Sequence, residues 1–516
     1  MKSLPNRGPY LQSRAIAVLF AVIFCGFYLW ISAERIVAPD EGYYLYAARM
    51  VSEGFLPYKD FFYPQAPLFP FAYGVLFKLF GCSWHVARFF SALLALITGA
   101  LLARYCKRKW GAVGFWLAGL LYFLSLFVSS WYTTAQTYSL SVFFLFLSFY
   151  LLSGGTENRR IFLAGLFFGL SVETRLFFIA LWPFFIPLFW GAEEKKGFDR
   201  FFRFSLGVIT ALLPLIIWYL FDPERVFYNN IGYHLNRSSQ SLAEALNHKL
   251  HILSVIFGFS ESVKFSGFQL ALLLWAALLS VADSLMRRRA PDAAVYLAFG
   301  IVAISFLPTP PYVQYFSAAI PFLVVAAVSF LKMVYESARG SVRFRRVSVV
   351  IPLIFSAFYL YKFPSDLSRY LYSGKGVIGM GSRRKPCDWK IDAIRAVSGR
   401  IDSLDSEAEY AGSVWPGYLV ETRVKAYPGL ENHFTFLASK KLKKSERKKY
   451  HLLSRADLNR LLEKGTLPLM VVNSRATGRR MREALKKGGY RVAAGLNGTS
   501  IYQKIFEMRL GGQPGL

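Results

Sequence analysis

Two neighbouring acidic residues, Asp40 and Glu41, come directly after the first long apolar segment of the chain. Residues 43–53, which follow them, have the spacing of a short amphipathic helix. We expect this helix to lie flat on a membrane, with both carboxylates at its N-terminus, facing water beside the lipid. Asp40 could also be nothing more than the N-cap of that helix.

An acidic pair at this place is suited to one kind of group transfer. Moving a sugar from a lipid phosphate to a hydroxyl or amine requires a carboxylate that takes the acceptor proton and basic groups that stabilise the departing phosphate. Basic candidates are Arg175, Lys59 and Arg237, because a cation at membrane depth is costly without an anionic partner. For Arg175 the alternative is a structural pair with Glu173.

The composition indicates a membrane protein. The chain has 516 residues, of which 54% are hydrophobic and 17% aromatic. Apolar stretches long enough to cross a bilayer recur along the first 362 positions. They predict about eleven transmembrane helices, near 15–36, 84–105, 110–130, 136–153, 161–173, 176–191, 204–221, 265–285, 292–308, 314–333 and 347–362. The net charge of +30 therefore indicates membrane topology rather than a nucleic-acid partner.

The charges of the loops predict the orientation. Basic residues concentrate in alternate loops, which the positive-inside rule places in the cytoplasm: Arg104, Lys107, Arg108, Lys109, Arg159, Arg160, Lys195, Lys196, Arg200, Arg203, Arg287, Arg288, Arg289, Arg339, Arg343, Arg345 and Arg346. Loops 37–83 and 222–251 and the tail from Phe363 then lie together on the outer side. This parity fails if 161–173 and 176–191 form one span instead of two.

The chain divides into a membrane domain, 1–362, which contains the first outer loop 37–83, and an outer domain, 363–516. The tail has the element order of a small α/β domain. We expect a helix near 388–403, strands at Glu409–Val414 and Pro468–Asn473, a helix over Thr477–Lys487 and strands at Tyr490–Ala494 and Thr499–Lys504. A basic run at 440–449 is either a solvated face or a contact with anionic lipid.

The sequence predicts neither a metal site nor a cofactor. Four scattered cysteines are too few for a disulfide framework or a zinc site. The histidines of loop 222–251 have no carboxylate or thiol placed to complete a metal site, and we interpret most aromatic residues there as an interfacial belt.

A set of spaced motifs resembles the large membrane glycosyltransferases of GT-C type. This group includes the aminoarabinose transferases of lipid A, the protein O-mannosyltransferases and the transferases that use dodecaprenyl-phosphate-galacturonate. The similarity extends over about 35–325, and its motifs are Asp-Glu-Gly-x-Tyr at 40–44, Gly54-x-x-Pro57-Tyr58-x-Asp60-Phe61, Pro67-Leu68, Leu79-Phe80-Gly81, Ala87-Arg88, Ala164-Gly165-Leu166-x-x-Gly169-Leu170 before Thr174-Arg175, and Tyr312-x-x-Tyr315-Phe316.

The resemblance implies a helical membrane bundle with juxtamembrane helices in the first outer loop and a soluble outer domain. It also implies an inverting transfer from a polyprenyl-phosphate sugar, with Asp40 as general base or acceptor-positioning acid and Glu41 as the second residue of the acidic pair. The substrate-binding candidates are Tyr58, Lys59, Gln65, Arg175, Arg237, Tyr312 and Tyr315. The chain departs from the aminoarabinose transferases at Pro64-Gln65-Ala66, where they carry a Glu-Lys pair, and Gln136 stands where relatives often have an acid.

The leading hypothesis is thus a hexosyl- or pentosyltransferase in the inner membrane, with its active site on the periplasmic or outer side. Its partners would be a polyprenyl-phosphate-sugar donor, a lipid or envelope-glycan acceptor such as lipid A, core polysaccharide or protein, and membrane lipids. The alternative is a flippase or transporter of a lipid-linked saccharide. Transporters usually show charged or broken helices at the midplane and internal repeats, whereas the acidic residues here cluster at one face. A scaffold for envelope assembly would leave the acidic loop unexplained.

Overall fold

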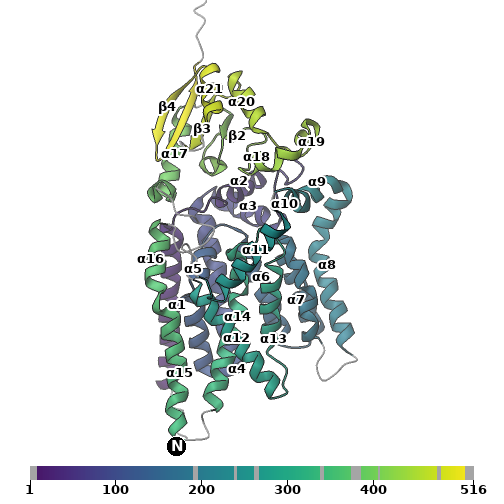
Figure 1. The fold of residues 1–516 in the computed structure, drawn as a ribbon, viewed down its shortest axis with the longest axis vertical. Helices are drawn as coiled ribbons and strands as arrows, with labels where there is room; N and C mark the ends of the chain where they lie inside the picture. Colours follow the sequence, from purple (N-terminus) through teal and green to yellow (C-terminus); the bar gives the residue numbers. More distant parts are fainter. Residues whose placement is uncertain are drawn as a thin grey trace, which may run out of the picture.

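The computed structural model describes residues 8–189, 196–237, 241–260, 267–337, 342–373, 385–404, 407–473 and 478–505. A bundle of long helices forms one part of the molecule, and the tail domain covers one end of it (Figure 1). Helical segments lie at all eleven positions predicted to span: α1 (Gly8–Glu34), the two halves of α4 (Trp84–Phe123), α6 (Thr137–Leu152), α7 (Asn158–Thr174), the 3₁₀ helix η1 (Leu176–Leu188), α8 (Gly197–Phe221), α12 (Phe268–Met286), α13 (Ala293–Ile304), η4 (Val313–Ala319) with α14 (Ile320–Ser337), and α15 (Val342–Tyr361).

Several of these helices are long and apolar enough to cross a membrane. Among the described residues five satisfy both conditions: Ala15–Glu34, Trp84–Phe123, Gly197–Phe221, Phe268–Met286 and Val313–Ser337. The apolar helices of α6, η1 and α13 are shorter. Large apolar side chains on α1 and α8 are exposed, as lipid-facing residues are, among them Val18, Val22, Ile217 and Leu220. The chain is a multi-pass membrane protein.

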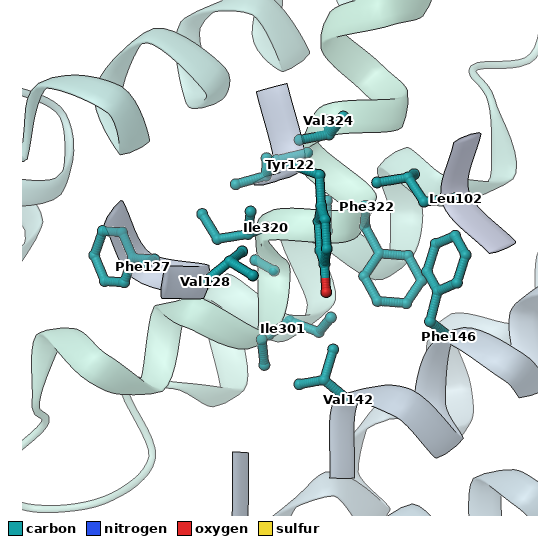
Figure 2. Packing of buried hydrophobic residues seen from close by; sticks show 14 of the residues in the cluster. Leu102, Tyr122, Phe127, Val128, Val142, Phe146, Ile301, Ile320, Phe322 and Val324 are labelled. Atoms are coloured by element: carbon teal, nitrogen blue, oxygen red, sulfur yellow. The ribbon is translucent and has the colours of Figure 1, made fainter. Parts of the chain in front are cut away.

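The packing in the bundle follows from aromatic side chains and from small residues at close helix approaches. Tyr122, Phe146 and Phe322 lie together in the core (Figure 2), where the Phe146 and Phe322 ring centroids are 5.4 Å apart. Helices α7 and α8 approach so closely that a Cβ at Gly165 would overlap the Phe204 carbonyl. Glycine provides such contacts between membrane helices because it has no side chain.

The path of the chain separates two pairs of predicted spans that follow closely in sequence, of which 161–173 and 176–191 was the uncertain pair. Helix α4 breaks at Trp110 and Gly111, and its second half folds back on the first, with the Tyr122 hydroxyl donating to the Ala95 carbonyl at 3.0 Å. Helices α7 and η1 are two separate segments: η1 returns along α7, with the Phe168 and Phe185 rings 4.8 Å apart. Residues 161–173 and 176–191 therefore form two segments and not one, as the predicted parity requires.

The outer loops contain the juxtamembrane helices that the resemblance implies. They are α2 (Glu41–Ser52) and α3 (Leu68–Phe80) in the first loop, α5 (Leu126–Trp131) in the second, and α9 (Pro223–Phe227), the π-helical turn η3 (Tyr228–Gly232), α10 (Tyr233–Asn236) and α11 (Leu242–Ile256) in the long one. The expectation that α2 has a water-facing side is wrong, because residues Glu41–Met50 are all buried. Helices α2 and α3 lie between the bundle and the tail domain (Figure 1).

The tail domain is built on a mixed five-stranded sheet with strand order β2-β1-β3-β5-β4. Strand β1 is parallel to β2 and β3, whereas β5 is antiparallel to β3 and β4. The elements in chain order are α16 (Phe363–Ser373), η6 (Pro386–Trp389), α17 (Ile391–Leu404), β1 (Tyr410–Ser413), η7 (Pro416–Leu419), β2 (Lys425–Ala426), α18 (Thr435–Ala438), η8 (Ser439–Lys441), α19 (Lys444–Lys449), α20 (Arg455–Glu463), β3 (Leu469–Asn473), α21 (Arg479–Lys487), β4 (Tyr490–Leu496) and β5 (Thr499–Lys504). Helix α16 packs on the membrane bundle, where the Tyr370 hydroxyl donates to the Ser130 carbonyl at 2.8 Å, and α17 packs against β4 and β5 of the sheet (Figure 1).

The predicted α/β tail is therefore correct, although β2, α18 and α20 were not foreseen and Thr477 lies outside the described residues. The basic run is divided between η8 and α19. Lys449, the last residue of α19, pairs with Glu224 of α9, so part of the run contacts the long outer loop.

Buried contacts fix the tail onto the first outer loop. The Trp415 indole donates to the Pro39 carbonyl at 2.7 Å, and a Cβ at Gly42 would lie 2.6 Å from the same indole. Arg49 of α2 donates to the carbonyls of Leu419 and of Val424. The three hydrophilic pieces predicted to share one side of the membrane therefore meet at one end of the bundle.

Candidate active site

Asp40 lies between the end of α1 and the start of α2, at the N-cap position of α2. Its side chain makes no capping hydrogen bond, and its carboxylate is about half exposed, at 45%. A capping carboxylate would be engaged with the first backbone N–H groups of the helix. The carboxylate of Asp40 is instead directed to a cavity.

Glu41 has the opposite environment. Its side chain is fully buried and accepts hydrogen bonds from Arg88 Nε and Nη2, both at 2.8 Å. It also accepts from the backbone N–H groups of Ala38 and Ala135. Arg88 in turn donates to the carbonyls of Ser32 and Arg35. The expectation that Glu41 faces water is therefore wrong. The buried pair of Glu41 and Arg88 joins the end of α1 and the start of α4 to the start of α2, and so positions Asp40.

A polar cavity of about 480 Å³ opens at Asp40. It is lined by residues of the first outer loop, of the long outer loop, of the bundle and of the tail. Six of the nine predicted site residues are among them: Asp40, Gln65, Arg175, Arg237, Tyr312 and Tyr315. The remaining lining residues are Tyr43, Tyr44, Pro64, Gln136, Tyr138, Tyr233, His234, Pro310, Gln314, Phe434 and Leu437. The cavity therefore combines one exposed carboxylate with two guanidinium groups and many hydrogen-bonding side chains.

Arg175 is held in this cavity by aromatic rings. It follows the last residue of α7, is 5% exposed, and its guanidinium carbon lies 4.3 Å from the centroid of the Tyr138 ring and 5.4 Å from that of Tyr315. The alternative pairing with Glu173 is not seen among the described residues, where Glu173 Oε1 is buried without a hydrogen-bond partner. The buried Nε of Arg175 has no hydrogen-bond partner in the described part of the chain. An anion in the cavity would satisfy this donor.

A second cavity, the apolar pocket, adjoins the polar one. It has a volume of about 350 Å³ and is lined mainly by apolar groups, including Leu176, Phe177, Ile231, Leu235 and Leu307. Five residues line both cavities: Gln65, Arg175, His234, Arg237 and Tyr315. Both arginines thus lie where the polar space meets the apolar one.

His234 and Tyr44, which line the polar cavity beside the arginines, are uncharged at neutral pH. Arg175 and Arg237 are therefore the cations where the two cavities meet. Burial, together with the charge of Arg237, lowers the pKa of His234 to about 4, and its Nε2 lies 3.0 Å from the Pro64 carbonyl, to which the neutral ring can donate. Burial raises the pKa of Tyr44 to about 12 against the opposing effect of Arg175, so its hydroxyl remains a donor. Tyr312 lies under Arg237, with 5.8 Å between the guanidinium carbon and the ring centroid.

Three predicted site residues are not in either cavity. Glu41 is enclosed with Arg88, as described above. Tyr58 is buried at a positive φ of 68°, donates to the Gln65 carbonyl at 2.6 Å and packs against Trp218. Lys59 is exposed at the surface of the first loop. Tyr58 therefore supports the loop segment that contains Gln65 and does not line the site.

The sequence interpretation missed the contribution of the tail. Phe434 and Leu437 line the polar cavity, and His433 Nε2 lies 3.6 Å from Asp40 Oδ1. Tyr233 and His234 of the long outer loop, where most aromatic residues were interpreted as an interfacial belt, also line it. Among the described residues no group of three His, Cys, Asp or Glu side chains could hold a metal ion, and all four cysteines are free.

The architecture and this cavity define a membrane protein with the GT-C fold, as the sequence motifs predicted. A family model described as "Dolichyl-phosphate-mannose-protein mannosyltransferase" matches residues 64–219. The chain is similar in structure to ArnT from Cupriavidus metallidurans. For the apo state the TM-score is 0.63 at 15% sequence identity, with 96% of this chain and 98% of that chain covered.

The structure of the same ArnT bound to undecaprenyl phosphate gives a TM-score of 0.62 at 16% identity, with 97% of this chain and 99% of that chain covered. No curated protein matches the sequence. At these identities the likeness establishes the fold, and the activity has to be argued from the site.

Proposed function

We propose that this protein is an inverting glycosyltransferase that moves one sugar, a hexose or pentose, from a polyprenyl-phosphate carrier to a lipid-linked or cell-envelope acceptor. One observation carries the proposal: Asp40 shares a polar cavity with Arg175 and Arg237, and both arginines also line the apolar pocket. A donor of this class has three parts, an apolar chain, a phosphate and a sugar. The apolar pocket, the two arginines and the polar cavity suit these parts in the same order.

The chemistry assigned to the site is a single displacement. The acceptor hydroxyl or amine attacks the anomeric carbon and transfers its proton to the Asp40 carboxylate. The bond between the anomeric carbon and the phosphate oxygen breaks, and its electron pair leaves with the phosphate. Arg175 and Arg237 stabilise the charge that develops there, as fixed cations in a partly dehydrated site do efficiently. Attack opposite to the leaving phosphate inverts the anomeric configuration.

The sugar has suitable partners around Asp40. Tyr43, Tyr44, Tyr138 and Tyr233 present ring faces and hydroxyls, and Gln65 and Gln136 present amides. Aromatic faces stack on sugars, while amides and hydroxyls hydrogen-bond to their hydroxyl groups. Gln136, which replaces an acid found in relatives, is uncharged, so Asp40 remains the proton acceptor of this proposal.

The test is transfer of radiolabelled sugar from a panel of polyprenyl-phosphate sugars in membranes that contain the wild type or Asp40→Asn. We expect the variant to lose at least about a hundredfold in rate, the scale of a general base. Asp60→Asn is the matched control, because Asp60 lies in the same loop but accepts from the Leu56 backbone N–H at 2.7 Å, outside the cavity. Full activity of Asp40→Asn would refute its role. Movement of the intact donor across the bilayer without transfer would favour a flippase.

The proposal also places the site on the outer face of the membrane, in agreement with the positive-inside distribution of the loops. Cys387, an exposed residue of the tail, provides the test. Cys82 of the first outer loop is also free and partly exposed, so the test uses Cys82→Ser. A membrane-impermeant maleimide should label this protein in right-side-out vesicles, and adding Cys387→Ser should remove the label. Labelling only in inverted vesicles would reverse the topology.

A further inference from the structure

We propose that His433 of the tail domain is a positioning and proton-relay residue for Asp40, so that the tail completes the active site. This inference rests on the proposed function, since it concerns the proton that Asp40 removes from the acceptor. Its basis is the position of His433, whose Nε2 lies 3.6 Å from Asp40 Oδ1.

The tail is held rigidly enough to supply a site residue. The Tyr46 hydroxyl of α2 accepts from the Ala426 backbone N–H at 2.7 Å, and the Trp415 indole donates to the Pro39 carbonyl, next to Asp40. The segment that follows β2 then leads to His433. Groups held by buried contacts of this kind can maintain a catalytic geometry, whereas groups on unsupported loops cannot.

The ring of His433 is oriented by aromatic contacts. Its centroid lies 4.2 Å from that of Phe434 and 5.5 Å from that of Tyr43. The Asn432 side chain accepts from the Phe434 backbone N–H at 2.9 Å and so fixes the turn that presents the histidine. His433 Nδ1 is buried without a hydrogen-bond partner in the described part of the chain. Nε2, the nitrogen near Asp40, is therefore the one placed to exchange a proton.

The charged and titratable groups around this pair come from several elements. Asp40 and Tyr43 face His433 from the first loop, and Glu431 lies two residues before it in the same segment. Arg175 and Arg237 share the cavity with Asp40. Burial, with Tyr44 and Asp40 adding to it, raises the pKa of Tyr43 well above its ordinary value, so this phenol does not compete for the proton. Glu431 is buried, and its carboxylate accepts from the Gly429 N–H at 2.7 Å.

The acceptor proton moves to water in steps, through Asp40 and His433. The acceptor loses its proton to Asp40 as it bonds to the anomeric carbon, and the phosphate leaves with the electron pair of the broken bond. Asp40 then passes the proton to the lone pair of His433 Nε2, which restores the carboxylate for the next turnover. His433 is 18% exposed at its side chain, so the proton can continue to water. A distance of 3.6 Å is compatible with this role, because such contacts often shorten when substrate binds.

The first test is the pH profile of transfer. His433→Gln should be about tenfold to a hundredfold slower at neutral pH, with an unchanged KM for the donor. Because this variant lacks an imidazole, its rate should depend less on pH between 8 and 5 than the rate of the wild type. A wild-type profile in His433→Gln would overturn the relay.

The matched control is His451→Asn, which removes another tail histidine. His451 lies beside the basic run and has a positive φ of 53°, a conformation that asparagine tolerates. This variant should keep both the rate and the pH profile of the wild type. An equal flattening of its profile would show that loss of any tail histidine has this effect, and would overturn the assignment.

A second test needs no activity. In a chain without native cysteines, Asp40→Cys combined with His433→Cys should be joined by a short thiol cross-linker, whereas Asp40→Cys with His451→Cys should not. A missing cross-link contradicts the proposed contact. A cross-link, together with a wild-type protein that transfers from no donor in the panel, contradicts the proposed function instead, so the two failures are distinguishable.

Discussion

Arg88 donates two hydrogen bonds of 2.8 Å to Glu41, the residue next to Asp40, and neither side chain is exposed. Of the acidic pair, one carboxylate thus holds the loop in place and the other faces the cavity. Glu41 has Arg88 of α4 as its charged partner and two backbone N–H groups as further donors, whereas Asp40 has none of these.

Removing the charge of Glu41 should destabilise the protein. Glu41→Gln leaves the guanidinium of Arg88 buried without a counter-ion, which typically costs about 3–5 kcal/mol. We expect a large decrease in the melting temperature in detergent, partly recovered in Glu41→Gln combined with Arg88→Met. Asp199→Asn is the control, because its pair with Arg203 has the same 2.8 Å distance but is exposed, and exposed pairs contribute little. Equal effects of the two substitutions would argue against the structural role of Glu41.

Arg175→Met should weaken binding of polyprenyl phosphate. A hydrogen bond to a charged group contributes about 1.5–3 kcal/mol, so affinity should fall about tenfold to a hundredfold. Direct binding of labelled polyprenyl phosphate measures it. Arg108→Met is the control: Arg108 also lies over a tyrosine ring, 4.7 Å from the centroid of Tyr150, but belongs to a loop predicted to be cytoplasmic. Unchanged binding by Arg175→Met would remove Arg175 from the phosphate site.

Filling the apolar pocket should discriminate between donors by chain length. Leu307→Trp adds volume to a pocket of about 350 Å³, and we expect the KM for long-chain donors to rise several-fold more than that for donors with two isoprene units. Leu285→Trp is a suitable comparison, because Leu285 is also an exposed apolar residue but lies near the end of α12. An equal rise for both chain lengths would place the carrier chain elsewhere.

Acidification should destabilise the outer loop at His234. Its folded-state pKa of about 4 lies below the unfolded value of about 6.5, so the unfolded chain binds a proton first and stability falls as the pH decreases from about 6.5 to 4. The loss approaches about 3 kcal/mol at 1.36 kcal/mol per pH unit. His234→Gln, which can still donate to the Pro64 carbonyl, should remove this part of the pH dependence of thermal unfolding. The exposed His251→Gln should not, and identical curves for wild type and His234→Gln would disprove the assignment.

The membrane part of the fold could be predicted because length and apolarity act locally. The eleven segments, the juxtamembrane helix at 43–53 and strand β5 follow from patterns within about twenty residues, whereas α3 was not predicted by its own pattern. Asp40, Arg175 and Arg237 could be found in the same way, since a charged side chain at membrane depth is costly unless it has a partner of opposite charge.

The rest of the site depends on contacts that a single sequence does not display. Glu41 and Asp40 are neighbours of the same chemical type, and only the approach of Arg88 separates their roles. Tyr58 has a positive φ that turns it away from the cavity. His433 and Trp415 lie in irregular tail segments without periodicity, and the Trp415 bond to Pro39 joins positions 376 residues apart.

The close fit of Trp415 on Gly42 also restricts how this protein can change. A side chain at position 42 would collide with the indole, and loss of the indole would leave the Pro39 carbonyl without its donor. Position 42 and the tail can therefore vary only together. We expect a chimaera that combines this membrane domain with the tail of a relative to work only when the graft brings a matching ring, so the two regions have to be exchanged as one unit.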